Sequence, residues 1–116
     1  MPVVLAATDP AQPYGATLPW PESAGRPARA SGALVVLGEG EPLCFVERSG
    51  RSLWTFPAAE ARLRWVEALA ERVRSGRVRQ HEIQSIDGDS ARTTRWAEPL
   101  RRAGYVDGYR GLVMRR

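Results

Sequence analysis

The 116-residue chain contains no lysine, and it has one cysteine and one histidine. A phosphate-binding loop of the Walker A type requires a lysine, so the sequence excludes that nucleotide site. His81 and Cys44 are too few for a conventional zinc site or an internal disulfide. The Gly-x-Ser-x-Gly elbow of serine hydrolases is also missing. We therefore expect no cofactor, no metal, no catalytic residue and no ATP hydrolysis in this chain.

Long apolar runs are missing as well. No segment approaches the roughly 20 apolar residues that cross a bilayer, and residues 1–7 lack the basic start of a signal peptide. Cys44 lies within an apolar run, where a thiol usually packs as a small hydrophobic group, and one unpaired cysteine fits a reducing compartment. We expect one domain in the cytoplasm, with no membrane partner.

The positive charge comes entirely from arginine, which gives the chain a net charge of +4. The planar guanidinium suits phosphates, carboxylates and aromatic faces. A compositional preference for arginine over lysine explains the same observation, so charge alone does not indicate a phosphate-binding surface.

The centre of the predicted fold is an antiparallel meander at residues 33–56. Residues 33–37, 43–46 and 53–56 are short apolar runs, with turn signals at residues 38–42 and at Ser49-Gly50. Residues 3–7 predict an edge strand. Residues 58–75 predict a helix whose apolar stripe includes Leu63 and Val66, with Trp65 at its margin.

The later segments predict two further strands and a shorter helix. Residues 78–86 read as one strand, with a bulge or an early end because Ile83 and Ile86 have opposite parity. Residues 94–103 predict the helix, which Pro99 weakens so that it could begin only at Glu98, and residues 111–114 predict the last strand. The expected class is α+β, an antiparallel sheet packed with two helices. Residues 33–116 form the main domain, after an N-terminal strand and proline-rich segment at 1–32.

Residues 8–31 hold five prolines and predict no regular structure. Tyr14, Leu18 and Trp20 are costly to leave in water, so residues 9–21 predict a docking segment. Its receiving surface is either this chain's own sheet or another domain. We favour the former and expect Trp20 to be substantially buried, whereas residues 23–31 predict a flexible connection.

The patterns around the remaining titratable side chains mostly favour structural rather than catalytic roles. His81 lies in a polar strand and predicts a solvated or hydrogen-bonded surface residue. Asp87 and Asp107 each precede glycine and predict turn aspartates that bond their own backbone; Asp9, before Pro10, is the more open candidate for acid–base chemistry.

The C-terminal quarter combines arginines with aromatic residues. Such a mixture can hold nucleic-acid backbones by charge and bases by stacking. The alternative is that the arginines merely solvate the surface. The candidate nucleic-acid-binding residues are Arg92, Arg95, Arg101, Arg102, Tyr109, Arg110, Arg115 and Arg116.

One family resemblance covers nearly the whole chain. Residues 9–21, Asp-Pro-Ala-Gln-Pro-Tyr-Gly-Ala-Thr-Leu-Pro-Trp-Pro, resemble a segment near the C-terminus of the large helicase-related (Lhr) bacterial superfamily 2 helicases. The similarity continues through residues 32–37, 45–53, 86–88 and 100–105. Gln12 stands where the family pattern has asparagine, and Pro99 interrupts an expected helix.

The resemblance implies a non-motor piece from the C-terminal end of an ATP-dependent 3′-to-5′ DNA helicase that acts in DNA repair. Its implied partners are the upstream domains of the parent protein and single-stranded DNA. An alternative of a different class is a protein–protein or oligomerisation module without nucleic-acid contact. A third hypothesis is part of a base-excision enzyme that uses an acidic residue such as Asp9.

Overall fold

The computed structural model describes residues 2–116, and their strands form two sheets rather than one. The first sheet has the order β1-β2-β3-β4-β6-β7, and the second has the order β5-β9-β8. The strands are β1 Val3–Ala6, β2 Leu34–Gly38, β3 Glu41–Val46, β4 Ser52–Thr55, β5 Gln80–Ile83, β6 Ser85–Ile86, β7 Asp89–Ser90, β8 Val106–Asp107 and β9 Leu112–Arg115. The helices are α1 Ala58–Ala61, α2 Arg64–Arg74, the 3-10 turn η1 Ala91–Thr93 and α3 Ala97–Ala103. The α+β class is confirmed.

The predicted meander is present as β2, β3 and β4, joined antiparallel. The turn before β4 places Gly50 at φ 78°, a conformation that glycine adopts without strain. Strand β1 pairs antiparallel with β2 and lies at the sheet edge, as predicted. At the other side β4 pairs parallel with β6, so the first sheet is mixed and not purely antiparallel.

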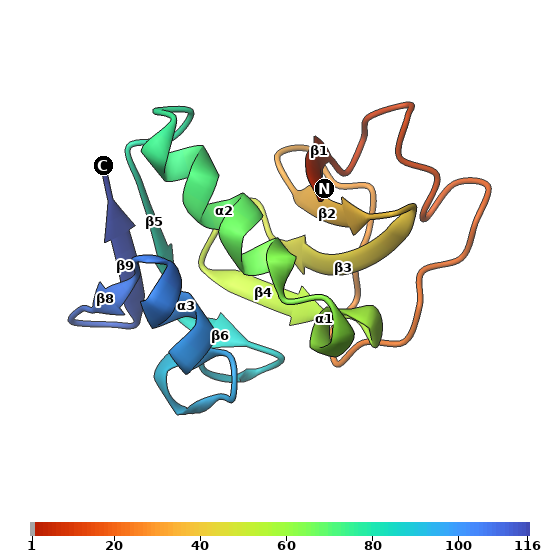
Figure 1. Cartoon of the computed structure of the whole chain (residues 1–116). Helices are drawn as coiled ribbons and strands as arrows, with labels where there is room; N and C mark the ends of the chain where they lie inside the picture. Colours follow the sequence, from red (N-terminus) through yellow and green to blue (C-terminus); the bar gives the residue numbers. More distant parts are fainter. Residues whose placement is uncertain (1) are drawn as a thin grey trace.

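Both faces of the first sheet are buried at its centre, in β2 and β3. Val36 faces the main core, which the helices and the second sheet complete, whereas Val35 and Leu37 face a smaller core with Phe45 and Phe56. Because adjacent residues of a strand point to opposite faces, a sheet buried on both sides requires the continuous apolar run seen at residues 33–37. Figure 1 shows α2 lying between the two sheets, while the N-terminal loops extend past β2 and β3.

The helix predicted at residues 58–75 is two helices with a break between them. Arg62 ends α1 in a non-helical conformation, φ −132° and ψ 74°, and its guanidinium donates to the Gly38 carbonyl at 2.9 Å. The break rotates the apolar stripe. Leu63 is consequently 44% exposed, and Trp65 is fully buried instead of lying at the margin.

The strand predicted at residues 78–86 also divides, because β5 joins the second sheet and β6 the first. The interruption between Ile83 and Ile86 is therefore confirmed as a change of sheet. Helix α3 begins at Ala97 and ends before Gly104 at φ 123°. Pro99 fits there because the first turn of a helix leaves its N–H groups without intrahelical partners.

The described residues hold neither a membrane-spanning helix nor a metal-binding cluster. In residues 2–116 no helix combines the length and apolar character needed to cross a membrane. The same residues contain no group of three or more acidic, histidine or cysteine side chains arranged for a metal ion.

Candidate nucleic-acid interface

The structure does not gather the eight predicted residues into one patch. Arg95 pairs with Glu60 of α1, a second group lies on or near α3 and the β8–β9 hairpin, and Arg115 and Arg116 lie at the end of β9. All eight side chains are exposed except Arg101, which is half-buried.

Two of these arginines are held by carboxylates of the same chain. Arg101 Nε donates to Asp107 at 2.9 Å, and its Nη1 lies 3.7 Å from Glu98. The hydrogen bond from Arg101 lowers the pKa of the Asp107 carboxyl. Arg95 lies 3.0 Å from Glu60 and over the Trp96 ring. Glu60 on α1 therefore pairs with an arginine distant in sequence. Arg101 and Arg95 have much of their charge neutralised within the chain.

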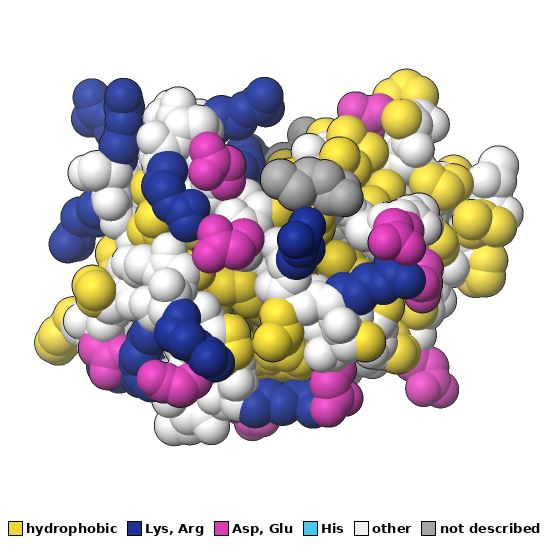
Figure 2. Space-filling view, in the orientation of Figure 1, with side chains coloured by type: hydrophobic (Ala, Val, Ile, Leu, Met, Phe, Trp, Pro, Cys, Tyr) yellow, Lys and Arg dark blue, Asp and Glu magenta, His cyan; other side chains and the backbone are white. Residues whose placement is uncertain are grey.

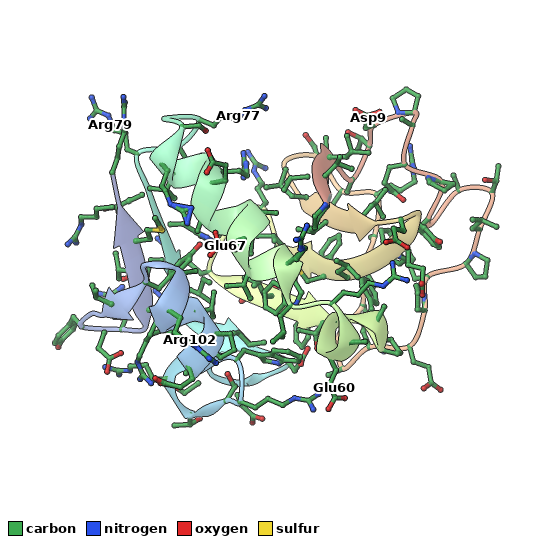
Figure 3. All side chains as sticks on the ribbon, viewed as in Figure 1. Asp9, Glu60, Glu67, Arg77, Arg79 and Arg102 are labelled. Atoms are coloured by element: carbon green, nitrogen blue, oxygen red, sulfur yellow. The ribbon has the colours of Figure 1, made fainter. Side chains whose placement is uncertain are left out.

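The β8–β9 hairpin carries the most exposed aromatic side chain among the described residues. Tyr109 is 92% exposed, and Arg110 follows it in the same loop. Arg92 reaches this loop from η1 and donates to the Gly108 carbonyl at 3.0 Å. Arg102 is exposed on α3 (Figure 3). Tyr109, Arg110, Arg92 and Arg102 form what we call the hairpin surface.

A second basic region was missed by sequence reasoning. Arg115 bonds Gln80 at 3.1 Å, and the Arg116 backbone N–H donates to the Arg79 carbonyl at 3.1 Å. The β5–β9 pairing thus brings Arg77 and Arg79 next to the C-terminal arginines. Residues 79 and 116 are far apart in the sequence, so the sequence pattern did not indicate this cluster. Predicting that the last strand pairs with the strand at residues 80–83 would have revealed it. Figure 2 shows basic side chains gathered at this end of the molecule.

The docking segment packs on the first sheet, as predicted, but not with all of its aromatic and aliphatic side chains. Trp20 is half-buried and stacks on Phe56 with centroids 5.9 Å apart. It also meets the edge of Phe45 at 5.7 Å. Tyr14 is half-buried and donates to the Gly40 carbonyl at 2.8 Å. Leu18 is 44% exposed, so its predicted role as a buried anchor is not seen.

Polar residues to which the sequence assigned no structural role hold this segment. Gln12 is fully buried; its amide nitrogen donates to the Ala7 and Tyr14 carbonyls at 2.9 and 3.0 Å, and its oxygen accepts from the Tyr14 N–H. Arg29 donates to the Gln12 and Thr8 carbonyls. Residues 23–31, predicted as a flexible connection, are therefore tied to the loop at 8–12.

His81 is hydrogen-bonded through both ring nitrogens. Nδ1 lies 2.7 Å from the Tyr105 hydroxyl and Nε2 lies 2.7 Å from the Gly50 carbonyl. Because a carbonyl only accepts, Nε2 carries the proton and Nδ1 accepts from Tyr105. Burial lowers the pKa of His81, and the nearby Arg72 adds to this. Cys44 is fully buried, which raises the pKa of its thiol and confirms a packing role.

The aspartates serve local structure. Asp87 does not bond its own turn, contrary to prediction: its carboxylate accepts from the Thr55 N–H at 2.7 Å and the Thr55 hydroxyl at 2.6 Å. Asp107 was also predicted to bond its own turn, but it lies in β8 and its carboxylate accepts from Arg101 instead. Asp9 accepts from the Ala11 N–H at 2.8 Å, a local turn contact.

The fold and its arginine-bearing surfaces define a small α+β module that has a basic surface and, in residues 2–116, no metal cluster. No protein-family model matches the chain. A protein of Mycolicibacterium smegmatis described as "Lhr helicase/ probable uracil glycosylase" is 49% identical over 89 residues, covering 74% of this chain and 6% of that protein. "Lhr helicase/uracil glycosylase" of Escherichia coli is 30% identical over 115 residues, covering 96% of this chain and 8% of that protein.

The chain therefore corresponds to a region of an Lhr-type helicase. The resemblance of residues 9–21 and 100–105 to the C-terminal end of such helicases agrees with this. The chain spans less than a tenth of the length of these two relatives.

Proposed function

We propose that the chain is a non-motor accessory module of an Lhr-type ATP-dependent 3′-to-5′ DNA helicase that acts in DNA repair. The upstream domains of the parent protein are its partners, and the module contributes contacts to single-stranded DNA. In this proposal residues 33–116 form the accessory domain, and residues 1–32 fasten to it through the docking segment.

The observation that carries the proposal is the hairpin surface. An aromatic ring that is 92% exposed contributes little to the stability of its own fold. Tyr109 instead offers a flat face on which a base can stack. Arg110 lies in the same hairpin, Arg92 contacts it from η1, and Arg102 lies on α3. Aromatic rings among cationic groups are the usual means of binding a single strand without sequence preference.

Fluorescence anisotropy with a labelled oligothymidine tests this proposal. We expect Tyr109→Ala to weaken binding by about 1–3 kcal/mol, the typical contribution of one stacked base. The double variant Arg102→Gln/Arg110→Gln should weaken binding and reduce its salt dependence. Arg26→Gln, an exposed arginine outside both basic regions, is the control for loss of charge. If Tyr109→Ala and Arg102→Gln/Arg110→Gln bind as tightly as the wild type and the Arg26→Gln control, the hairpin surface is not the interface.

The alternative function is assembly with protein, and exposed aliphatic side chains favour it. Val3 on the edge strand β1 is 49% exposed, and Val106 on β8 is 61% exposed. Edge strands with apolar side chains are common pairing surfaces. Light scattering after size exclusion distinguishes the two proposals, because a stable oligomer that does not bind the oligonucleotide supports assembly.

Base excision receives less support from this chain. The two relatives carry uracil glycosylase in their names, but Asp9 is engaged in a turn with Ala11. We propose no excision step for these residues.

A further inference from the structure

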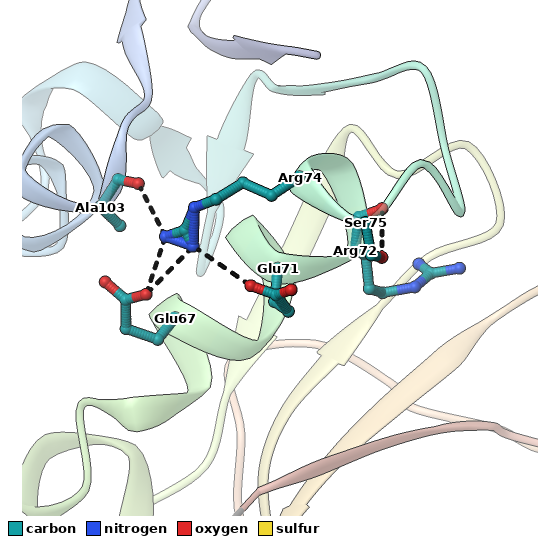
Figure 4. Close-up of polar contacts among 6 residues, drawn as sticks. All are labelled: Glu67, Glu71, Arg72, Arg74, Ser75 and Ala103. Carbon is teal, nitrogen blue, oxygen red and sulfur yellow. Dashed lines mark hydrogen bonds and ion pairs between the residues drawn. The ribbon is translucent and has the colours of Figure 1, made fainter.

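Arg72, on the last turn of α2, has a charge that nothing nearby neutralises. Its side chain is half-buried, and among residues 2–116 its guanidinium has no hydrogen bond or ion pair. Figure 4 shows the contrast with Arg74 on the same turn, which bonds Glu67, Glu71 and the Ala103 carbonyl. Burial, and then the neighbouring Arg77, lower the pKa of Arg72. A charge that has lost water without gaining a counter-ion is destabilising.

The acidic residues beside Arg72 are already engaged. Glu67 lies 2.8 Å from Arg74 and Glu71 lies 3.5 Å from it. Among the described residues, the arginines in ion pairs are Arg62, Arg74, Arg95 and Arg101. Arg72 therefore has no counter-ion among residues 2–116 and is available to bind an anion.

The turn after α2 adds further guanidinium groups to the same end of the molecule. Gly76 has φ 82°, and a Cβ atom there would lie 3.0 Å from Cζ of Arg116, so that side chain crosses the turn closely. Arg77 and Arg79 follow Gly76 and point away from the ribbon at this end (Figure 3). We call Arg72, Arg77, Arg79 and Arg116 the α2-end cluster.

A groove adjoins the α2-end cluster. It lies between β1 and α2 and has a volume of about 640 Å³, within the usual range for small-ligand sites. Val3, Val4 and Ala68 contribute apolar walls, and Arg72 and Arg77 line the same groove. Its lining also includes Glu67 and Glu71, whose carboxylates pair with Arg74. Phosphate-binding groups beside an apolar groove match the two halves of a nucleotide.

We infer that the α2-end cluster binds the phosphates of a single-stranded nucleic acid and that the adjoining groove receives an unstacked base. Arg72 is the inner contact, and Arg77, Arg79 and Arg116 extend the basic path along the surface. The inference rests on the proposed function and adds a second contact region, at the end of β9 opposite Tyr109. Its residues lie outside the sequence-predicted set except for Arg116.

The test compares two charge-matched double variants of the full chain, with labelled oligothymidine as the probe. Arg77→Gln/Arg79→Gln removes two exposed members of the α2-end cluster, and Arg102→Gln/Arg110→Gln removes two arginines of the hairpin surface. We expect Arg77→Gln/Arg79→Gln to weaken binding about tenfold or more at low salt. The slope of log affinity against log salt should become shallower by about 1.4, since a single strand loses about 0.7 per phosphate contact. Arg72→Gln should weaken binding further while leaving the unfolding midpoint unchanged or raised.

The outcomes separate the inference from the proposed function. If Arg77→Gln/Arg79→Gln binds like Arg26→Gln while Arg102→Gln/Arg110→Gln binds weakly, the inference is wrong and the proposed function stands. If the wild type shows no salt-dependent binding, both are wrong. Poly-glutamate that displaces the oligonucleotide at equal charge would show an acidic protein partner instead, and inorganic phosphate that does so would show an isolated anion site. If an abasic strand binds as tightly as oligothymidine, the groove does not receive a base and that part of the inference is wrong.

Discussion

At the scale of single residues, Trp20 connects the proline-rich segment to the sheet. Its ring stacks on Phe56 and meets Phe45, but it is only half-buried. We therefore predict that Trp20→Ala lowers the free energy of unfolding by about 1–3 kcal/mol, less than the 3–5 kcal/mol of a fully buried ring. Denaturant unfolding checks this. Leu18→Ala is the matched control in the same segment and should change the midpoint little, because Leu18 is 44% exposed; equal effects would contradict the packing described.

The lowered pKa of His81 makes the stability of the fold depend on pH. Its pKa in the folded protein is below the ordinary value of 6.5, so the unfolded chain binds a proton more readily. The contribution of neutral His81 to stability is present above pH 6.5 and is lost as pH falls below it. Tyr105, Gly50 and Arg72 are the groups that face the ring.

Because the chain has one histidine, unfolding measured between about pH 5 and 7 isolates this effect. The wild type should lose stability toward pH 5, and His81→Gln should show a flatter dependence. Parallel curves for the two proteins would mean that His81 titrates like a solvated histidine.

Several residue-level features could be predicted because they depend on neighbours in sequence. Gly50, in the turn predicted at Ser49-Gly50, adopts a positive φ, and Cys44 is buried within its apolar run. Gln12 and Arg72 could not be predicted. Their roles depend on partners brought close by the folded chain, or missing from it, and the sequence pattern carries no information on those contacts.

At the scale of elements, the break between α1 and α2 decides which side chains are buried. Apolar spacing alone favours one helix, but Arg62 leaves the helix to bond Gly38 and to pair with Glu41 at 3.2 Å. We predict that Val66→Ala, at a position 3% exposed, destabilises the fold by about 1–3 kcal/mol. Leu63→Ala should cost well under that amount. Equal losses in denaturant unfolding would indicate a continuous helix.

The turn between β6 and β7 is fastened to β4 by Asp87. Two hydrogen bonds to an ionised carboxylate contribute more than neutral ones. Asp87→Ala should therefore lower the free energy of unfolding by about 2–3 kcal/mol, because both hydrogen bonds are lost and alanine keeps the Cβ atom that is disfavoured at φ 56°. Asp89→Ala, an exposed position two residues away, is the control. Thermal unfolding that shifts equally for both would contradict a tertiary role for Asp87.

At the scale of the whole molecule, local patterns predicted the elements better than their arrangement. The meander followed from apolar runs separated by turn residues, and the family resemblance at residues 9–21 followed from one proline-rich motif. The second sheet did not follow, since β5 and β9 are separated by nearly thirty residues. That pairing creates the α2-end cluster, so the sequence could predict arginines near the C-terminus but not Arg77 and Arg79 beside them.

The central claim is that the two basic regions contact single-stranded DNA. The most direct measurement is a map of backbone amide shifts in the ¹⁵N-labelled chain as an oligothymidine is added. The account predicts that the shifts concentrate at residues 72–79, at residues 101–110 and at the end of β9, and that they reverse at high salt. Amide shifts confined to the docking segment would contradict this claim. The absence of any shift at a large excess of oligothymidine would also contradict it.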